Sequence, residues 1–239
     1  MEPLTPPGDV VNDYHDTWLV IPVYNEGQVI ADVVEQALKV FPHIVCVDDG
    51  SRDDSVERIL STGAHLVSHP VNLGQGAALQ TGLSYALAQP GAEYFVTFDA
   101  DGQHQTGDAE KLVALLQEDA ADVVLGSRFI EQNDQVPLLK RVVLRTAATI
   151  SPTARRLKLT DSHNGLRGLN RKAALRMRIT MNGMAHASEI VGQLARSDLR
   201  VAEIPVDILY TDYSRAKGQS LLNGVNILFD ISLRERGRR

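Results

Sequence analysis

The chain has 239 residues, of which 44% are hydrophobic and 23% are charged, and its net charge is −6. This composition provides the core of one sizeable α/β domain and excludes disorder as the default state. A single cysteine, Cys46, excludes a disulfide framework and a cysteine-based zinc site, and we expect it to be a buried thiol. The negative net charge and the 5% aromatic content argue against a nucleic-acid-binding protein.

Charge is divided unevenly along the sequence. Residues 1–126 have a net charge of −16, whereas residues 127–239 have a net charge of +10. An acidic segment can hold a cation, and a basic segment can face phosphate groups or anionic lipid. We therefore expect the two halves to have different tasks.

The first half of the chain alternates short apolar strands with helical patterns. Residues 1–16 are acidic and proline-rich, unlike a signal peptide, and are predicted to form a flexible tail. Strands are predicted at 17–24, 43–51, 64–68, 94–101 and 122–127, with helices at 29–41, after residue 54, at 76–88 and at 108–118. This order predicts a single α/β domain with a Rossmann-like, mainly parallel sheet flanked by helices. Ligands are expected beyond the carboxyl ends of its strands.

After Arg128 the pattern becomes looser. The predicted elements are a basic and apolar helix at 137–150, a glycine-bearing turn at 161–170, a helix at 184–196 and a strand at 200–210. Residues 217–239 have an apolar face followed by arginines, so they form either a helix that docks on the protein or one that lies at a membrane surface. No apolar stretch in the sequence reaches the ~20 residues that span a bilayer.

Polar residues gather where the first strands are predicted to end. The loop "PVYNE" presents Tyr24 and Glu26 after Pro22, which is expected to stop the strand ladder, although a plain helix cap fits the same residues. In "VDDGS", Asp48 or Asp49 either caps the next helix or accepts hydrogen bonds from a base or ribose.

Two glycines in "NLGQGAALQTG", Gly74 and Gly76, resemble a dinucleotide fingerprint. The preceding strand is weak and the last glycine of that fingerprint is missing, so we reject this motif.

The stretch "FDADGQH" places two carboxylates two residues apart at the end of a strand. Asp99 and Asp101 repel one another, and a divalent cation is the simplest means of keeping both ionised. Oxygen ligands without sulfur favour Mg²⁺ or Mn²⁺, and Gln103 offers a further amide oxygen. His104 is expected to be a neighbouring loop residue rather than a ligand. For this motif alone, a metal-free turn rich in Asp and Gly is the alternative.

The motifs "PVYNE", "VDDGS", "NLGQGAALQTG", "DADGQH", "GSR", "NGLRG" and "EIPV", in this order, resemble the catalytic domain of glycosyltransferase family 2, which has the GT-A fold. The likeness covers about residues 17–220 and is closest to dolichol-phosphate mannosyltransferases and bacterial polyprenyl-phosphate glycosyltransferases. The sequence departs from the family at Gln75, where relatives often have a basic residue, and at "DSHNGLRG", which replaces the more usual "D-TSGFR".

The resemblance implies a metal-dependent, inverting transfer of a sugar from a GDP- or UDP-sugar. The residues implied in nucleotide-sugar binding are Pro22, Tyr24, Glu26, Asp49, Gly76, Asp99 and Lys217. Mg²⁺ or Mn²⁺ on the donor diphosphate would be held by Asp99, Asp101 and Gln103.

Negative charge that develops on the departing phosphate needs cations to stabilise it. Arg215 and Lys217 are the leading candidates besides the metal at Asp101, and Arg128 and Arg167 follow short turns where a guanidinium suits phosphate oxygens. For each of these residues, a surface charge or a structural salt bridge is the alternative.

The expected acceptor is a lipid phosphate such as polyprenyl or dolichyl phosphate, which is already ionised and needs no strong base. A saccharide hydroxyl is the alternative acceptor, and it would need a base such as Asp161 or Glu189, unless these are helix caps or ion-pair partners. A non-catalytic nucleotide-sugar-binding subunit is the alternative of another class.

The expected organisation is a tail over 1–16, a GT-A domain over 17–216 and an amphipathic helix with a basic tail over 217–239. Within the domain, 17–126 would bind nucleotide and metal, and 127–216 would bind the acceptor. Each Lys or Arg near an anionic leaflet contributes about 1 kcal/mol. We therefore expect a cytoplasmic protein that is peripheral at the inner face of the membrane, by itself or through a separate membrane subunit.

Overall fold

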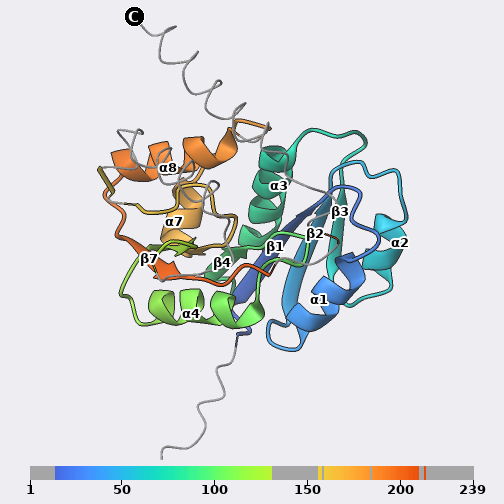
Figure 1. Ribbon diagram of the computed structural model, residues 1–239, viewed down its shortest axis with the longest axis horizontal. Helices are drawn as coiled ribbons and strands as arrows, with labels where there is room; N and C mark the ends of the chain where they lie inside the picture. The colour runs from blue at the N-terminus through green and yellow to red at the C-terminus, as the bar shows by residue number, and fades with distance from the viewer. Residues whose placement is uncertain (1–13, 131–155, 158, 184, 210–212, 214–239) are drawn as a thin grey trace, which may run out of the picture.

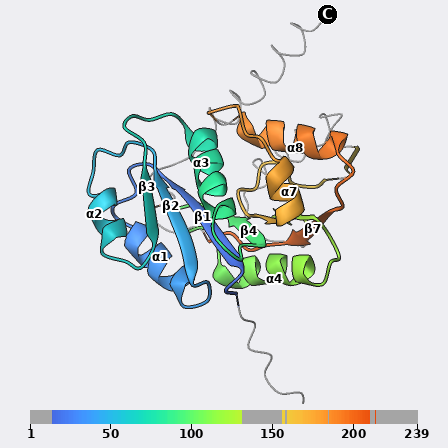
Figure 2. The same cartoon turned by 180° about the vertical axis from the view of Figure 1, so that it is seen from behind.

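The computed structural model describes residues 14–130, 156–157, 159–183, 185–209 and 213. The helices predicted at 137–150 and 217–239 lie outside these residues. Figures 1 and 2 show one central sheet with helices on both sides. Among the described residues, no helix combines the length and apolar character that crossing a membrane requires.

The sheet has seven strands in the order β3-β2-β1-β4-β6-β5-β7. The strands are β1 (Thr17–Val23), β2 (His43–Asp48), β3 (His65–Ser68), β4 (Tyr94–Thr97), β5 (Val123–Ser127), β6 (Arg167–Asn170) and β7 (Val201–Pro205). All neighbouring strands are parallel except at β6, which runs antiparallel to both β4 and β5. The predicted mainly parallel α/β sheet is therefore confirmed.

The helices are α1 (Ile30–Leu38), α2 (Ser55–Leu60), α3 (Gln75–Leu87), α4 (Thr106–Gln117), α7 (Arg171–Arg176) and α8 (His186–Arg196). Side chains of α1, α2 and α4 pack on one face of the sheet, and side chains of α3, α7 and α8 pack on the other. Alternate residues of β1 serve the two layers: Leu19 and Ile21 point into the first, and Trp18 and Val20 into the second.

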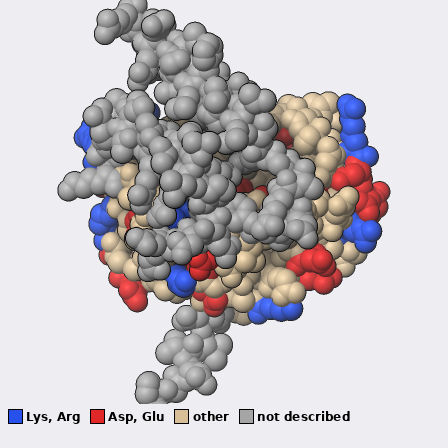
Figure 3. Space-filling view, viewed as in Figure 1, with Lys and Arg blue, Asp and Glu red and all other residues tan. Residues whose placement is uncertain are grey.

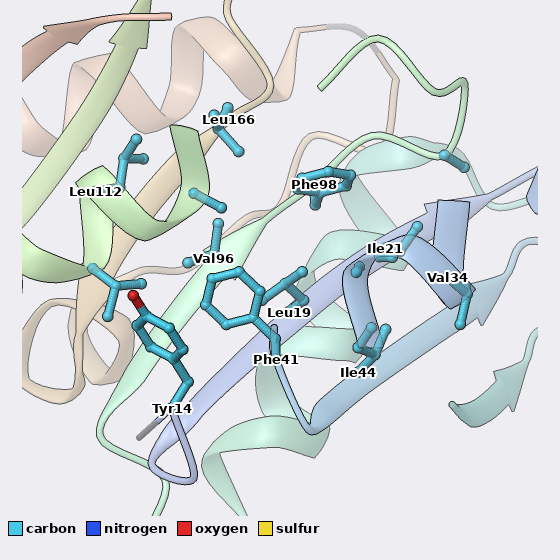
Figure 4. Packing of buried hydrophobic residues seen from close by; sticks show 14 of the residues in the cluster. Tyr14, Leu19, Ile21, Val34, Phe41, Ile44, Val96, Phe98, Leu112 and Leu166 are labelled. Carbon is cyan, nitrogen blue, oxygen red and sulfur yellow. The ribbon is translucent and has the colours of Figure 1, made fainter. Parts of the chain in front are cut away.

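The first apolar layer is drawn in Figure 4, where Phe41 lies among Leu19, Ile44 and Val96. Cys46 belongs to this layer and is fully buried, as predicted. Burial raises the pKa of its thiol to about 12, so it is an inert core group.

Strand β6 and helix α7 were not predicted from the sequence. The strand contains Gly168, where an added Cβ would lie 3.0 Å from Leu116 Cδ1 and 3.2 Å from Leu112 Cβ, so α4 packs directly on its backbone. Asn170 ends the strand and caps α7, because its Oδ1 accepts a hydrogen bond from Ala173 N at 2.9 Å. A four-residue strand of this composition lacks the alternation that identifies longer strands.

The loop "PVYNE" also differs from expectation, because Pro22 does not stop the strand. Strand β1 continues to Val23, with Pro22 opposite Val47 of β2. Val20 O accepts a hydrogen bond from Phe98 N, so the backbone groups of Val20 point toward β4. Backbone groups two residues apart in a strand point to the same side. The ring nitrogen of Pro22, which has no hydrogen to donate, therefore also faces the β4 side. The ladder with β4 has already ended at Val20, and proline costs no hydrogen bond there.

Asp122, at the start of β5, joins three strands at the edge of the sheet opposite the polar loops. Its carboxylate accepts hydrogen bonds from Asn170 Nδ2 at 3.0 Å, from Arg200 N at 2.9 Å and from the Arg200 guanidinium. Hydrogen bonds from Arg200 hold the pKa of Asp122 well below its usual range. The side chain is 2% exposed, so its removal leaves several donors without a partner.

We predict that Asp122→Ala lowers the free energy of unfolding by about 2 kcal/mol, because charge-assisted hydrogen bonds are lost in a buried position. Urea denaturation at neutral pH measures the change. The pKa of Asp122 is lowered by folding, so its contribution is present above pH ~4 and is lost as the pH falls. The control is Asp198→Ala, which removes an exposed ion pair with Arg176 and should leave the unfolding curve unchanged. An equal loss in both variants would contradict this role.

Candidate functional site

The polar loops predicted from the sequence meet at the carboxyl edge of the sheet. Strands β1 and β2 end in register, with Val23 opposite Asp48, and Asp49 N donates to Val23 O at 2.8 Å. His69 N then donates to Asp48 O at 2.8 Å, so the loop after β3 follows the same edge. On the face drawn in Figure 3, acidic and basic side chains lie beside one another along the described rim of the molecule.

The loop after β1 is held by the segment before α2. Asn25 N donates to Ser51 Oγ at 2.9 Å, and Glu26 N donates to Ser55 Oγ at 2.9 Å. Asn25 has a positive φ of 54°, a conformation that asparagine tolerates better than most residues. Tyr24 is 41% exposed at this fixed loop and is accessible to a ligand. Pro22, in contrast, is buried within the strand.

Asp49 lies under the loop that leads into α3. Its oxygens accept hydrogen bonds from Leu73 N at 2.9 Å and Gly74 N at 2.7 Å, and His69 Nδ1 lies 2.7 Å from Oδ1. His69 Nε2 contacts Thr81 Oγ1 at 2.9 Å, which ties this group to α3. Asp49 is 2% exposed, so its present contacts are those of a residue that shapes the loop. A direct role in nucleotide binding stays a prediction.

Gly76 begins α3 beneath the segment before α8. Its N–H donates to Asn182 O at 2.8 Å, and an added Cβ would lie 2.1 Å from Met181 O. Any larger residue would push these two segments apart. Gly76 therefore allows the backbone of α3 to approach the backbone of Met181 and Asn182 closely. Contact between Gly76 and a nucleotide sugar stays a prediction.

Asp99 is held by three segments that are distant in sequence. Gln75 Nε2 donates to its Oδ1 at 3.2 Å, and His104 Nε2 lies 3.0 Å from its Oδ2. A Cβ on Gly165 would lie 2.1 Å from Asp99 Oδ2, so the carboxylate occupies the space that any side chain there would need. Burial acts to raise the pKa of Asp99, but the hydrogen bond from His104 and the charge of Arg167 outweigh it and lower the pKa.

Asp101 has the opposite electrostatic character. Its Oδ1 accepts a hydrogen bond from Gln103 N at 3.0 Å. Burial and the negative charge of Asp99 raise its pKa to about 6. The two carboxylates are thus close enough to disfavour joint ionisation. A divalent cation beside them would remove this penalty.

The ligand chemistry of this pair fits Mg²⁺ or Mn²⁺. No group of three His, Cys, Asp or Glu suited to a metal occurs among the residues the structure describes. Two carboxylates and the Gln103 amide leave coordination positions for water and phosphate oxygens, as these ions usually require. His104 contacts Asp99 and lies with its ring against Phe98 at 5.5 Å, which agrees with the predicted neighbouring role.

Arg128 forms a buried ion pair with Asp161. Its Nε and Nη2 donate to the two Asp161 oxygens at 2.6 and 2.9 Å. Burial acts to raise the pKa of Asp161, but the charge and hydrogen bonds of Arg128 outweigh it and lower the pKa. The ion-pair alternative for Asp161 is therefore observed, and a carboxylate of low pKa is a weak base.

Glu203 of β7 holds the turn that carries this ion pair. Its carboxylate accepts hydrogen bonds from Asp161 N at 2.9 Å and Thr160 N at 2.8 Å. Ser127 Oγ lies 2.6 Å from Thr160 Oγ1 on the same turn. The motif "EIPV" contains Glu203, but no local pattern predicts its role, because its partners are 42 and 43 residues away in the chain.

The remaining predicted charges differ in their surroundings. Glu189 accepts hydrogen bonds from Thr180 N and Met181 N, both at 2.9 Å, so the capping alternative is observed. Arg167 is 4% exposed and interacts electrostatically with Asp99 and Asp161. Arg215 and Lys217 lie outside the described residues.

Tyr213 was missed by sequence analysis, although it stands two residues before Arg215. Its hydroxyl donates to Glu26 Oε2 at 2.7 Å, which links the second half of the chain to the loop after β1. The one sequence feature that could have indicated Tyr213 is its position next to the predicted cations Arg215 and Lys217. Gln75, which was noted as a departure from the family, proves to be a partner of Asp99.

Comparison with known proteins identifies the family. Residues 18–177 match Glycosyl transferase family 2 over more than half of the chain. The chain belongs to this family. The family 2 chain is 31% identical to an uncharacterized protein of Methanocaldococcus jannaschii, over 92% of both chains. It is 29% identical to a UDP-N-acetylglucosamine–dolichyl-phosphate N-acetylglucosaminyltransferase of Methanococcus voltae, covering 92% of this chain and 96% of that one.

The fold of this family 2 protein is also found among solved structures. Glucosyl-3-phosphoglycerate synthase from Mycobacterium tuberculosis, crystallised with Mn²⁺, UDP and glucosyl-3-phosphoglycerate, matches with a TM-score of 0.64. The sequences are 16% identical, and the match covers 90% of this chain and 81% of that one. The protein is therefore a glycosyltransferase with the GT-A fold, as the resemblance implied.

We predict that Asp101→Asn stabilises this family 2 glycosyltransferase at pH 7.5 when divalent cations are removed with EDTA. The pKa of Asp101 is raised to about 6 in the folded protein, so its effect on stability is favourable at low pH and unfavourable as the pH rises through that value. Chemical denaturation at pH 7.5 and pH 5.0 measures the difference between variant and parent. The advantage of the variant should shrink at pH 5.0. A difference that is the same at both pH values would contradict the assigned repulsion.

Proposed function

We propose that the protein transfers a sugar, with inversion, from a nucleoside-diphosphate sugar to a lipid phosphate, using Mg²⁺ or Mn²⁺. The observation that carries this proposal is the pair of carboxylates, Asp99 and Asp101, after β4, with Asp99 held in place by Gln75 and His104. Mn²⁺ and UDP in the mycobacterial structure support a divalent metal ion and a nucleotide as ligands of this protein.

Asp99, Asp101 and the Gln103 amide would hold the metal. When bound, the ion would neutralise the diphosphate that leaves the sugar. The protein contributes a rigid setting for it: Asp99 is fixed by Gln75 and His104, and the exposed ring of Tyr24 offers a surface for the nucleotide.

The positive charges of the second half would serve the acceptor. Asp161 and Glu189, which were the candidate bases for a hydroxyl acceptor, are both occupied by hydrogen bonds or an ion pair. An acceptor phosphate needs no base, so these contacts favour a lipid phosphate over a saccharide hydroxyl. The Methanococcus voltae relative, whose name includes dolichyl phosphate, supports the same class.

The site of action in this proposal is the cytoplasmic face of the membrane. The positive charge of residues 127–239 would attract the chain to an anionic leaflet, with Arg215 and Lys217 close to the donor diphosphate. A separate membrane subunit is the other means of recruitment.

We predict that Asp101→Ala abolishes metal-dependent sugar transfer without unfolding the protein, because one of two carboxylate ligands is lost. Turnover is measured with UDP-glucose, UDP-N-acetylglucosamine and GDP-mannose, with polyprenyl phosphate in detergent and Mg²⁺ or Mn²⁺. Thermal-shift screening with nucleoside diphosphates and Mn²⁺ identifies the base beforehand. Asp119→Ala is the control, because Asp119 contacts Arg200 far from this edge.

Unchanged transfer by Asp101→Ala would refute the metal assignment. Transfer to saccharide hydroxyls but not to polyprenyl phosphate would refute the acceptor class. Membrane recruitment is measured separately by flotation with anionic liposomes, and a protein that stays in the soluble fraction would refute peripheral binding.

A further inference from the structure

Buried polar atoms without a hydrogen-bond partner gather around Asp99. Among the described residues, such side-chain atoms are His104 Nδ1, His163 Nε2, Asn164 Nδ2 and Arg167 Nη1. His104 contacts Asp99, Arg167 acts on it electrostatically, and Asn164 is followed by Gly165, which packs against its carboxylate. Elsewhere, buried groups such as Asp122 are well paired. Unsatisfied groups confined to one place indicate that a ligand or water completes them.

Two of these atoms belong to side chains whose other contacts involve Asp99. Arg167 lines a small, mostly apolar cavity of about 10 Å³ together with Leu83 and Ile190, and its charge also interacts with Asp99 and Asp161. The His104 ring is fixed by its contacts with Asp99 and Phe98, so His104 is a positioned neighbour of Asp99. The turn of His163 and Asn164 therefore needs a separate explanation.

The Asn164 amide is fixed in one orientation. Its Oδ1 accepts a hydrogen bond from Leu166 N at 2.9 Å. If the oxygen and nitrogen of the amide were exchanged, the NH2 group of Asn164 would face the N–H of Leu166, and two donors would meet. Its Nδ2 is consequently a donor that cannot turn toward another partner. The side chain is 96% buried, since 4% of the residue is exposed, and leaving such a donor unpaired is costly.

The surroundings of Asn164 suit a neutral hydroxyl better than an anion. The neighbouring residue Gly165 touches the Asp99 carboxylate, which would repel a phosphate placed beside the amide. A sugar hydroxyl can accept a hydrogen bond from an amide and donate one to a carboxylate at the same time. In the proposed function, the transferred sugar is attached to the diphosphate near Asp99, which brings its hydroxyls to this turn.

We propose that Asn164 selects the donor sugar by donating a hydrogen bond from Nδ2 to one ring hydroxyl. This inference rests on the proposed function. Asn164 is also one of the positions at which the sequence departs from the more usual family motif, because "TSGFR" has serine there. The proposed hydrogen bond would account for this difference. His163 supports the turn, with its Nδ1 2.9 Å from Ser162 Oγ.

The test compares deoxy and deoxyfluoro analogues of the accepted nucleotide sugar in the parent and in Asn164→Asp. This variant keeps the oxygen that accepts from Leu166 N but removes the donor. In the parent, loss of one particular hydroxyl should lower kcat/KM about tenfold, because a buried donor is left unpaired. In Asn164→Asp, the same analogue and the complete donor should have about equal kcat/KM values. Asn164→Ser, with the more usual family residue, should change the preference between donors that differ at that hydroxyl.

Gln117→Glu is the matched control, because it makes the same amide-to-acid change on an exposed side chain at the far end of α4. It should leave every analogue ratio unchanged. Equal analogue ratios in the parent and in Asn164→Asp at every hydroxyl would overturn the role of Asn164. Donor affinity is also measured by calorimetry with Mn²⁺, so a chain that binds but does not transfer would contradict the proposed function alone. A chain that binds no nucleotide sugar would contradict both.

Discussion

Repulsion between Asp99 and Asp101 is the constraint around which the carboxyl edge of the sheet is organised. Three segments contact Asp99. The start of α3 does so through Gln75, the loop after β4 through His104, and the turn before β6 through Gly165. These contacts keep one carboxylate ionised and fixed. The carboxylate of Asp101 is harder to ionise, because its pKa is raised to about 6. The pair is therefore asymmetric before any ligand arrives.

Charges elsewhere in the described structure are treated differently. Asp122 has several donors from Asn170 and Arg200, and Asp161 has a bidentate arginine. These groups stabilise the fold as it stands. At the edge near Asp99, by contrast, buried donors have no partner and a carboxylate has an unfavourable neighbour. Proteins tend to keep such local conflicts where function requires them.

The sequence was sufficient to predict the sheet and its polar edge, because these depend on local patterns. Asp99 and Asp101 were identifiable since they are two residues apart at the end of an apolar run. Strand β6 was missed because its four residues have no alternation, and its pairing depends on α4 packing against Gly168. The partners of Asp161 and Glu203 are set by tertiary contacts that no local pattern encodes. Pro22 was misinterpreted because the point at which β4 stops pairing is not readable from β1.

The contact between Ser127 and Thr160 holds together the two ends of a long chain segment. These residues are 33 positions apart, yet their hydroxyl oxygens are 2.6 Å from one another, and the Arg128–Asp161 ion pair closes the same junction. The chain segment between them therefore starts and ends at this junction. Doubling the length of such a closed loop costs only about 0.6 kcal/mol. Because the junction fixes both ends of this segment, a change in the segment's length should leave Asp99 and the end of β4 in place.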